Sequence, residues 1–367
     1  MMVNQEVQPN GEMGMKISKR GTLALLVAAC ISGFAGQVMA QGAQKPIPVR
    51  IQDFGTNPLT TPYNFARAEG LFEKAGLNMN YLPSIYNAGG IFNVLVQGQA
   101  EIAYSGPNPV IPLVQQGRNM KIIAVIAQGF EIKVALTNKV MDDLAKKGIT
   151  ADSPLQQRLQ ALKGMRIVSP AAGSTSDLGF RYALKKYGMD PNRDVIIQPL
   201  PDLASLIAAV KQGAVDGIQG SFASGVGQLQ AEGVAKVFLE FEKHDKGLAT
   251  VPFNILAAND DYIKSNPEAI RRVLSAFNAA KVAIRRGLTE DELMKIKKQF
   301  MPDMKEDVYR GLVKAVTYQL VGPMTASREQ HETLMGIVNA MADTPAKLTY
   351  EQIFDTRIAE AVEKAGK

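Results

Sequence analysis

Hydroxyl side chains and one carboxylate are concentrated in the stretch 173-GSTSD-177, directly before apolar residues with helical spacing. Such hydroxyls can attack a substrate, can accept hydrogen bonds from the free N–H groups of a helix start, or can help those groups bind a polar ligand. Leu178 and Tyr182 recur four residues apart. We therefore expect a helix that begins near Thr175 and is capped by Ser174.

Catalysis is the least supported of these roles. A nucleophile elbow requires Gly-x-Ser-x-Gly with a partner histidine, and this stretch lacks the second glycine. The two histidines of the chain, His244 and His331, are far apart, and no Cys/His/carboxylate cluster has metal-ligand spacing. The sequence predicts no catalytic residue, no metal site and no cofactor, and an exported serine hydrolase is kept as an alternative.

Asp177 complicates the binding role. Its spacing from Ser174 fits a capping box, and its spacing from Arg181 predicts an ordinary surface ion pair worth about 0.2–0.5 kcal/mol. Capping and ligand binding by Ser174, Thr175 and Ser176 can coexist. A carboxylate beside the site would repel an anion, so Asp177 either points away or faces a cationic or donor group, as in a taurine-like zwitterion or a heterocycle.

The strands and helices that position the stretch 173–177 can be predicted from the sequence. Short β-rich runs alternate with helical patterns from Pro46 onward. This alternation predicts an α/β fold with mainly parallel strands. The segment 95-LVQGQAEIAYSG-106 is echoed by 210-VKQGAVDGIQGS-221, with a Gln-Gly helix end, then Glu101 or Asp216, then a strand and a Gly/Ser loop. Each copy is a β-α-β-α-β unit, so the repeat predicts two lobes.

Ligands of open α/β sheets bind beyond the carboxyl ends of the strands, so we expect the site in the cleft between the lobes. The repeat assigns the first loop of lobe one, 55-GTNPLTTPYNF-65, as the counterpart of the serine-rich loop, with Thr61 as a cap before a first-turn proline. Tyr63, Tyr86 and Phe222 either wall the solute or pack in the core. The remaining candidate ligand-binding residues follow strands or start helices in the two copies: Asn57, Thr61, Asn87, Ser105, Gly106, Asn108, Asp202 and Ser221.

The first forty residues have the pattern of a targeting segment. A basic region precedes an apolar core that is too short to span a bilayer, and small residues precede Gln41. We expect a signal peptide over 1–40, cleaved near Ala40, and export to the periplasm. The alternative is a lipoprotein anchored at Cys30, the single cysteine. The chain has a formal net charge of +6 without a Lys/Arg run, which argues against a nucleic-acid partner.

Several spaced motifs across nearly all of the chain after residue 40 carry a family resemblance: 66-ARAEGLFEKAGLNMNYLP-83, 98-GQAEIAYSG-106, 164-GMRIVSPAAGSTSD-177, 205-SLIAAVKQGAVDGI-218 and 262-YIKSNPEAIRRVLSAF-277. Together they resemble the periplasmic solute-binding proteins of nitrate, sulfonate and taurine ABC importers, which share a domain with thiamine-pyrimidine precursor binders. The stretch 220-GSFAS-224 departs from members that carry an aromatic residue after an acidic one, so no member's specificity is transferred.

The resemblance implies a type II periplasmic binding protein clamshell. Lobe one would comprise 46–130 plus 245–367, with C-terminal helices, and lobe two 131–244. It implies a non-enzymatic monomer that captures a small anionic or zwitterionic solute and delivers it to an ABC permease with its ATPase. The alternatives are a ligand sensor without transport and a binder of an aromatic acid or a pyrimidine precursor. The pyrimidine-forming enzyme that shares the domain requires a cysteine cluster, which this sequence lacks.

Overall fold

The computed structural model describes residues 45–340, 342 and 344–366. The expected signal peptide over 1–40 and the alternative lipid anchor at Cys30 lie outside these residues. Everything below concerns the unit Pro46–Lys367. Among its described residues, the structure has no helix that is both long and apolar enough to cross a membrane.

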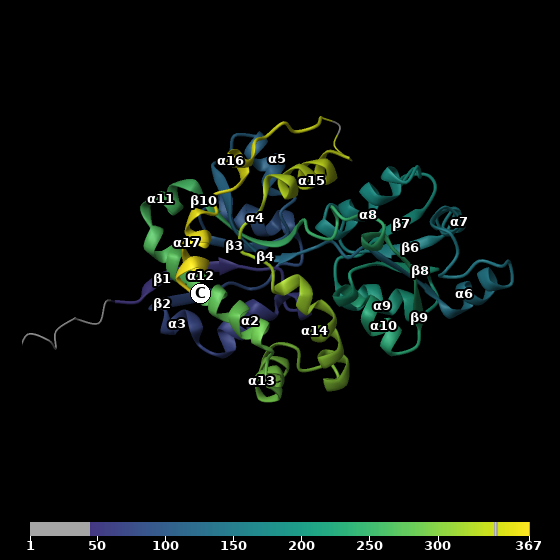
Figure 1. Cartoon of the computed structure of the whole chain (residues 1–367), viewed down its shortest axis with the longest axis horizontal. Coiled ribbons are helices and arrows are strands. Elements are labelled where there is room, and N and C mark those ends of the chain that lie inside the picture. Colours follow the sequence, from purple (N-terminus) through teal and green to yellow (C-terminus); the bar gives the residue numbers. More distant parts are fainter. Residues whose placement is uncertain (1–44, 341, 343, 367) are drawn as a thin grey trace, which may run out of the picture. The chain divides into compact units, whose positions relative to one another are not determined.

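The first sheet has five strands in the order β2-β1-β3-β10-β4 (Figure 1). Strands β2, β1 and β3 are parallel, whereas β10 runs antiparallel to both of its neighbours. The strands are β1 (Ile47–Gln52), β2 (Leu77–Tyr81), β3 (Ile102–Ser105), β4 (Met120–Gln128) and β10 (Pro252–Asn259). The connecting helices are η1 (Pro58–Thr60), α2 (Thr61–Ala68), α3 (Leu71–Lys74), α4 (Ala88–Val96) and α5 (Val110–Gln115).

The second sheet repeats this arrangement in the order β7-β6-β8-β5-β9, with β5 in the place that β10 takes in the first sheet. Its strands are β5 (Lys133–Thr137), β6 (Arg166–Ser169), β7 (Ile196–Pro199), β8 (Gly217–Gly220) and β9 (Ala235–Glu240). Its helices are α6 (Asn138–Ala145), α7 (Leu155–Ala161), α8 (Thr175–Lys186), α9 (Leu203–Lys211), η2 (Phe222–Val226) and α10 (Gly227–Ala231). The predicted two-lobed α/β class and its repeat are confirmed.

Both sheets are mixed, but four of the five strands in each run in one direction, as the predicted mainly parallel sheet requires. The exception is β10 in the first sheet and β5 in the second, which enters from the other lobe and runs antiparallel to both of its neighbours. The chain crosses between the sheets from β4 to β5 and from β9 to β10. The division into lobes at 46–130 with 245–367 and at 131–244 remains a prediction, with which the strand positions agree.

The repeat extends to individual contacts. The Arg50 N–H donates to a Glu101 carboxylate oxygen at 2.6 Å, and the Arg166 N–H donates to an Asp216 carboxylate oxygen at 2.8 Å. These are the two carboxylates that follow the echoed Gln-Gly pairs. Both helix-ending glycines have a φ of +67°, the left-handed conformation that the sequence pattern required.

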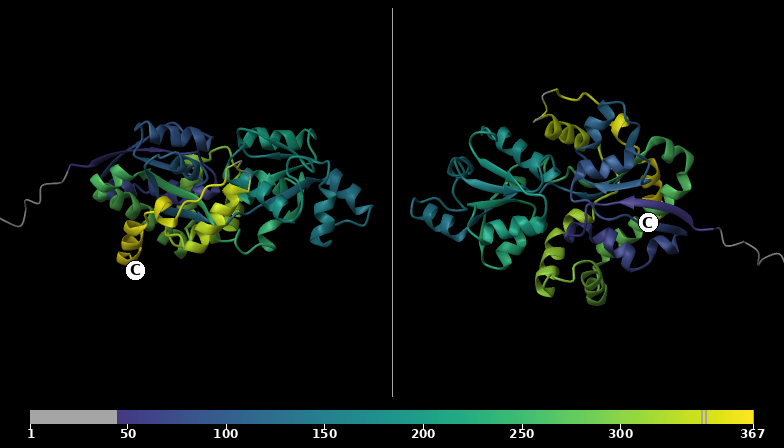
Figure 2. Two further views of the ribbon diagram at one scale, coloured as in Figure 1. Left: turned by 90° about the horizontal axis from the view of Figure 1, so that it is seen from above. Right: turned by 180° about the vertical axis from the view of Figure 1, so that it is seen from behind.

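The C-terminal part is helical, as expected, and α12 (Pro267–Arg286) has a proline as its first residue. Helix α12 lies against α2 and α17 beside the first sheet (Figures 1 and 2). Its apolar face and the first sheet form a core around Val273, Leu274 and Phe277. The other elements after β9 are η3 (Phe241–Lys243), α11 (Asp260–Ser265), α13 (Glu290–Phe300), α14 (Glu306–Leu320), α15 (Arg328–Asn339), α16 (Tyr350–Ile353) and α17 (Arg357–Ala365).

Candidate functional site

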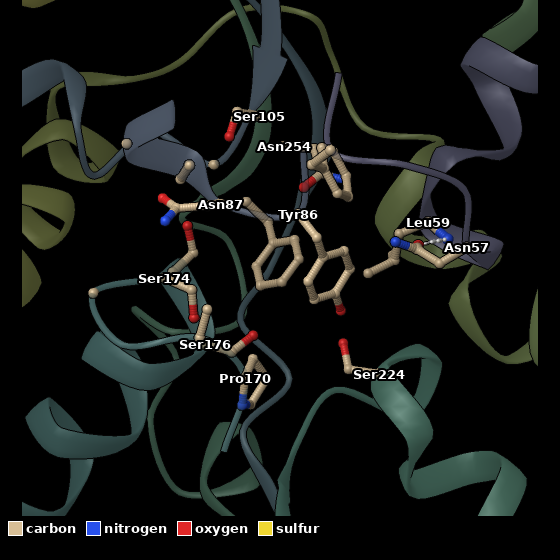
Figure 3. A pocket seen from close by; sticks show the side chains of 18 of the residues that line it. Asn57, Leu59, Tyr86, Asn87, Ser105, Pro170, Ser174, Ser176, Ser224 and Asn254 are labelled. Atoms are coloured by element: carbon tan, nitrogen blue, oxygen red, sulfur yellow. Dashed lines mark hydrogen bonds between the residues drawn. The ribbon is translucent and has the colours of Figure 1, made fainter. Parts of the chain in front are cut away.

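A cavity with an empty volume of about 780 Å³, partly open to solvent, lies where the strands of both sheets end (Figure 3). Its walls come from loops after strands in both lobes and from the crossing strand β10. The position agrees with the general rule for open α/β sheets. Eight of the residues suggested by the sequence line it: Asn57, Tyr86, Asn87, Ser105, Gly106, Ser174, Thr175 and Ser176.

Helix α8 begins at Thr175, as predicted, and its first turn faces the cavity. The Ser174 hydroxyl accepts a hydrogen bond from the Asp177 N–H at 3.3 Å. The N–H groups of the first two helical residues, Thr175 and Ser176, have no carbonyl partner within the helix. This loop therefore offers backbone donors and three hydroxyls to a ligand.

Helix α4 presents a second helix start from the other lobe. The Asn87 side chain caps it by accepting from the Gly90 N–H at 3.3 Å, and Asn87, Ala88 and Gly89 all line the cavity. The N–H groups of Ala88 and Gly89 are the first two of this helix and again lack intrahelical partners. Two helix N-termini, each with a partial positive charge, therefore meet at one cavity.

Asp177 does not line the cavity. Its side chain is only 3% exposed and points into lobe two, where it accepts from the Gly173 N–H at 3.0 Å, from Arg181 Nε at 3.0 Å and from the Ser169 hydroxyl at 3.3 Å. The predicted capping box is not formed, because the carboxylate reaches the Gly173 N–H instead of the Ser174 N–H. The predicted pair with Arg181 is formed, but it is not a surface pair, because both side chains are mostly buried.

The lobe-one loop is capped one turn earlier than expected. Asn57 caps η1 by accepting from the Leu59 N–H at 2.8 Å, and the Thr60 hydroxyl accepts from the Asn57 N–H at 3.0 Å. Thr61 is not a cap: it is the first residue of α2, and its hydroxyl donates to the Pro58 carbonyl at 2.6 Å. Thr61 lies buried, away from the cavity.

Five further predicted residues also lie outside the cavity lining: Tyr63, Asn108, Asp202, Ser221 and Phe222. Tyr63 is fully buried and stacks on Phe277 with ring centroids 5.9 Å apart, so the core alternative holds. Asp202 caps α9 by accepting from the Ser205 N–H at 2.8 Å, which lowers the pKa of its carboxyl. Asn108 is buried after β3.

Ser221 and Phe222 start the turn η2 and also miss the cavity lining. The Ser221 hydroxyl is 2.8 Å from that of Ser224. Ser224, two residues beyond Phe222, does line the cavity, and η2 is kinked there: Ser224 and Gly225 have non-helical backbone angles, with a φ of +95° at Gly225. The repeat thus identified the correct loop but not the residue that reaches the ligand space.

The cavity-lining residues that sequence reasoning missed fall into two groups. Those in loops after strands, together with the first turn of α4, could have been inferred from the repeat: Phe54, Leu59, Ala88, Gly89, Pro170, Ala171, Ala172, Gly173 and Ser224. Phe253 and Asn254 lie on the crossing strand β10, which enters the first sheet antiparallel to β3 and β4. No local motif signals that approach.

Tyr86 comes from the loop after β2 and reaches toward the second lobe. Its ring lies in the cavity with the hydroxyl directed toward Ser224 (Figure 3). Burial, together with the Asp202 carboxylate of lobe two, raises the pKa of Tyr86. The side chain is 39% exposed, so it forms part of the mouth of the cavity.

The lobes touch at the cavity through Gly106 and Thr175. A Cβ atom placed on Gly106 would lie 2.0 Å from the Thr175 hydroxyl oxygen. Glycine therefore allows the loop after β3 to approach the start of α8 this closely. In this structure the loop after β3 in lobe one is therefore in contact with the start of α8 in lobe two.

A polar network centred on the buried Glu131 lies at the crossing segments. Glu131, between β4 and β5, accepts from the Tyr318 hydroxyl of α14 at 2.5 Å and from the Phe222 N–H at 2.9 Å. Burial, followed by the Glu131 carboxylate, raises the pKa of Tyr318. Gly129, two residues before Glu131, has a φ of +89°. A Cβ atom on Gly129 would lie 2.7 Å from the Ala249 carbonyl oxygen, which belongs to the other crossing. Both crossings are therefore tightly packed.

The duplicated sheets joined by two crossings define the two-lobed α/β fold of periplasmic binding proteins. The chain belongs to the NMT1-like family, whose model matches residues 46–297. It is 29% identical over 194 residues to the nitrate/nitrite binding protein NrtA of Nostoc sp. PCC 7120, a match that covers 51% of this chain and 39% of NrtA. The chain spans 59% or less of the length of the curated relatives it matches.

Solved structures share the fold at low identity. The periplasmic aliphatic sulphonate binding protein SsuA of Escherichia coli has a TM-score of 0.64 at 17% identity, over 84% of this chain and 98% of SsuA. The periplasmic nitrate-binding protein NrtA of Synechocystis PCC 6803 has a TM-score of 0.65 at 17% identity, over 87% of this chain and 88% of that one. The desulfurization enzyme DszB is similar as well, with a TM-score of 0.60 at 13% identity over 88% of this chain and 100% of DszB. These similarities are similarities of fold.

Proposed function

We propose that the chain is the solute-binding component of an ABC importer. It captures a small anionic solute in the cavity between its lobes and delivers it to a permease with its ATPase. The observation that carries the proposal is that the N-termini of α4 and α8 face one cavity from opposite lobes. Such a pair of helix starts favours an anion, because unpaired N–H groups and the helix dipoles act together.

The comparisons support this class. Three of the four proteins named above are described as nitrate- or sulphonate-binding proteins, and two of these as periplasmic. We accordingly place the chain in the periplasm as a monomer, exported by the segment before Gln41. A cationic or zwitterionic solute is less well supported than an anion, because Asp177 is turned into lobe two and no Asp or Glu lines the cavity.

The lobes can capture a solute by rotating about the two crossings. Hinge closure of this kind brings the two halves of a site together around a ligand and gives the partner a distinct closed form to recognise. The loop that holds Gly106 and the start of α8 at Thr175, which are in contact here, would separate on opening. The Glu131 network lies at the crossings and would be altered by the same motion.

An enzymatic role, as in DszB, has less support in this cavity. Its lining, all within the described residues, contains serines but no His, Cys, Asp or Glu that could act as their general base. A nucleophilic serine would therefore lack a partner. Binding without covalent chemistry needs none of these groups.

A thermal-shift screen with nitrate, sulfonates, aromatic acids and pyrimidines tests the proposal. A ligand present at 100 times its dissociation constant should stabilise the chain by about 2.7 kcal/mol. The double variant Ser174→Ala/Thr175→Ala should then bind that ligand more weakly, because two hydroxyls of the α8 start are lost. If no small solute shifts the melting curve, while an ester is hydrolysed and Ser174→Ala abolishes the hydrolysis, the transport proposal fails.

A further inference from the structure

The cavity has an unusual combination of walls: two helix starts, three aromatic side chains and no charged side chain. Its lining residues, all within the described part of the chain, include no Lys, Arg, His, Asp or Glu. The only electrostatic attraction for an anion comes from the α4 and α8 starts, each equivalent to roughly half a positive charge. Such a site suits one negative charge and does not compensate two.

Asn254 adds a donor on a third side. It lies on β10, is 3% exposed and lines the cavity, and its Nδ2 makes no hydrogen bond of ordinary geometry, although the buried Tyr104 hydroxyl lies beside it. A buried amide without a partner costs about 1–3 kcal/mol, so a ligand acceptor at this position recovers free energy. Figure 3 shows Asn254 and Tyr86 among the side chains that line the pocket.

The remaining walls are flat and apolar. Phe54, Tyr86 and Phe253 line the cavity together with Leu59 and Pro170. The Phe253 ring is held edge-on against Phe130, with centroids 5.2 Å apart and planes at 83°. Aromatic rings held in place favour a ligand ring that can stack or pack edge-to-face, by about 0.5–1.5 kcal/mol beyond simple burial.

We infer that the solute is an aromatic monocarboxylate. Its carboxylate would accept from the N–H groups of the two helix starts and from the Asn254 amide, and its ring would lie among Phe54, Tyr86 and Phe253. Nitrate has no apolar body and would leave these rings in contact with water. The ammonium group of taurine would find no carboxylate in the lining. This inference rests on the proposed function and names its substrate class.

Calorimetry with the purified chain tests the inference, using five probes: benzoate, benzamide, nitrate, taurine and terephthalate. Benzoate should bind more tightly than its neutral isostere benzamide, by a factor of about ten or more, because charge-assisted hydrogen bonds are about twice as strong as neutral ones. Nitrate, taurine and the dianion terephthalate should all bind more weakly than benzoate.

Three variants assign the benzoate contacts. Tyr86→Ala should weaken benzoate binding about tenfold, whereas Tyr86→Phe should change it little, because the ring and not the hydroxyl makes the contact. Asn254→Leu should also weaken benzoate binding about tenfold through loss of the amide donor. Asn119→Leu, at an asparagine outside this cavity, is the matched control and should bind as the wild type does.

The outcomes separate this inference from the proposed function. Tight binding of nitrate or taurine without benzoate binding overturns the aromatic class and leaves the solute-binding function standing. Benzoate binding that is unaffected by Tyr86→Ala overturns the assignment of the ring wall, even if Asn254→Leu fails to fold. If none of the five probes binds the folded chain, the inference is overturned, and the function then depends on the wider thermal-shift screen.

Discussion

Replacing Gly106 by alanine should keep the lobes from reaching the arrangement seen in this structure. The new Cβ would stand 2.0 Å from Thr175 Oγ1 and 3.2 Å from Thr175 Cβ. An ordinary contact needs about 3.5 Å, so the loops must separate by more than 1 Å or the threonine must rotate. Rotation relieves only the shorter contact and itself costs about 0.5–1.5 kcal/mol if it leaves a favoured rotamer. The backbone of Gly106 needs no positive φ, so alanine should not strain lobe one.

Overpacking of this kind typically costs about 1–3 kcal/mol. If closure is coupled to binding, the affinity of Gly106→Ala for a solute found in the screen should fall about 5- to 150-fold. The melting temperature without ligand should stay close to that of the wild type, because the clash lies between lobes. Isothermal titration calorimetry measures the affinity for the solute. Small-angle X-ray scattering with saturating solute should show that Gly106→Ala is less compact than the wild type.

Two further variants isolate the cause. Thr175→Ala removes Oγ1, so Gly106→Ala/Thr175→Ala should recover part of the affinity relative to the product of the two single effects. Gly336→Ala, in α15, places a Cβ with nothing within 4 Å and is the control. Wild-type affinity and compactness in Gly106→Ala would show that the lobes do not close onto this contact, and the reasoning would be refuted.

Three other predictions concern the supports of the site. Asp177→Asn leaves the mostly buried Arg181 without its carboxylate and should lower the free energy of unfolding by about 2 kcal/mol in urea titrations; an unchanged midpoint would contradict the buried pair. Burial, then a neighbouring arginine, lowers the pKa of Lys281 to about 7, so the folded chain loses a proton that the unfolded chain keeps up to about pH 10.4. Below pH 7 the folded chain bears the cost of a buried charge, and above pH 7 deprotonation of Lys281 relieves it. The free energy of unfolding should therefore rise from pH 7 to 9 more steeply in the wild type than in Lys281→Met. Parallel curves for the two proteins would refute this. Glu131→Gln and Tyr318→Phe should each shift solute affinity, with a coupling above about 0.5 kcal/mol in a double-mutant cycle; strictly additive effects would argue against a shared hinge network.

The sequence was sufficient for the class of fold because a duplicated pattern is a long-range signal. The structure has the Gln-Gly helix ends and the carboxylates after them where the sequence pattern places them. It also has helix starts at Asn87 and Thr175, as predicted. Local chemistry predicted local structure less well. Ser174 and Asp177 fit a capping box by spacing, but the acid turns to the Gly173 N–H because Ser169 and Arg181 supply further donors inside the lobe.

The parts of the cavity that the sequence did not predict are those built by distant segments. Asn254 reaches the ligand space only because β10 crosses from the second lobe and inserts between β3 and β4. Ser224 reaches it because the chain bends within η2. Neither residue differs in type or spacing from ordinary strand and turn residues, so periodicity could not distinguish them.

The duplication also explains how a cavity without Lys or Arg can attract an anion. In each β-α-β-α-β unit, parallel strands direct the following helix starts to the same sheet edge, and two units joined by two crossings turn those edges toward one another. Backbone N–H groups of α4 and α8 are fixed by the fold and cost no side-chain entropy to order. A buried ammonium or guanidinium would carry a desolvation cost of several kcal/mol in the empty closed form. Helix starts avoid that cost, so the lobes can approach as closely as Gly106 and Thr175 do without an uncompensated charge between them.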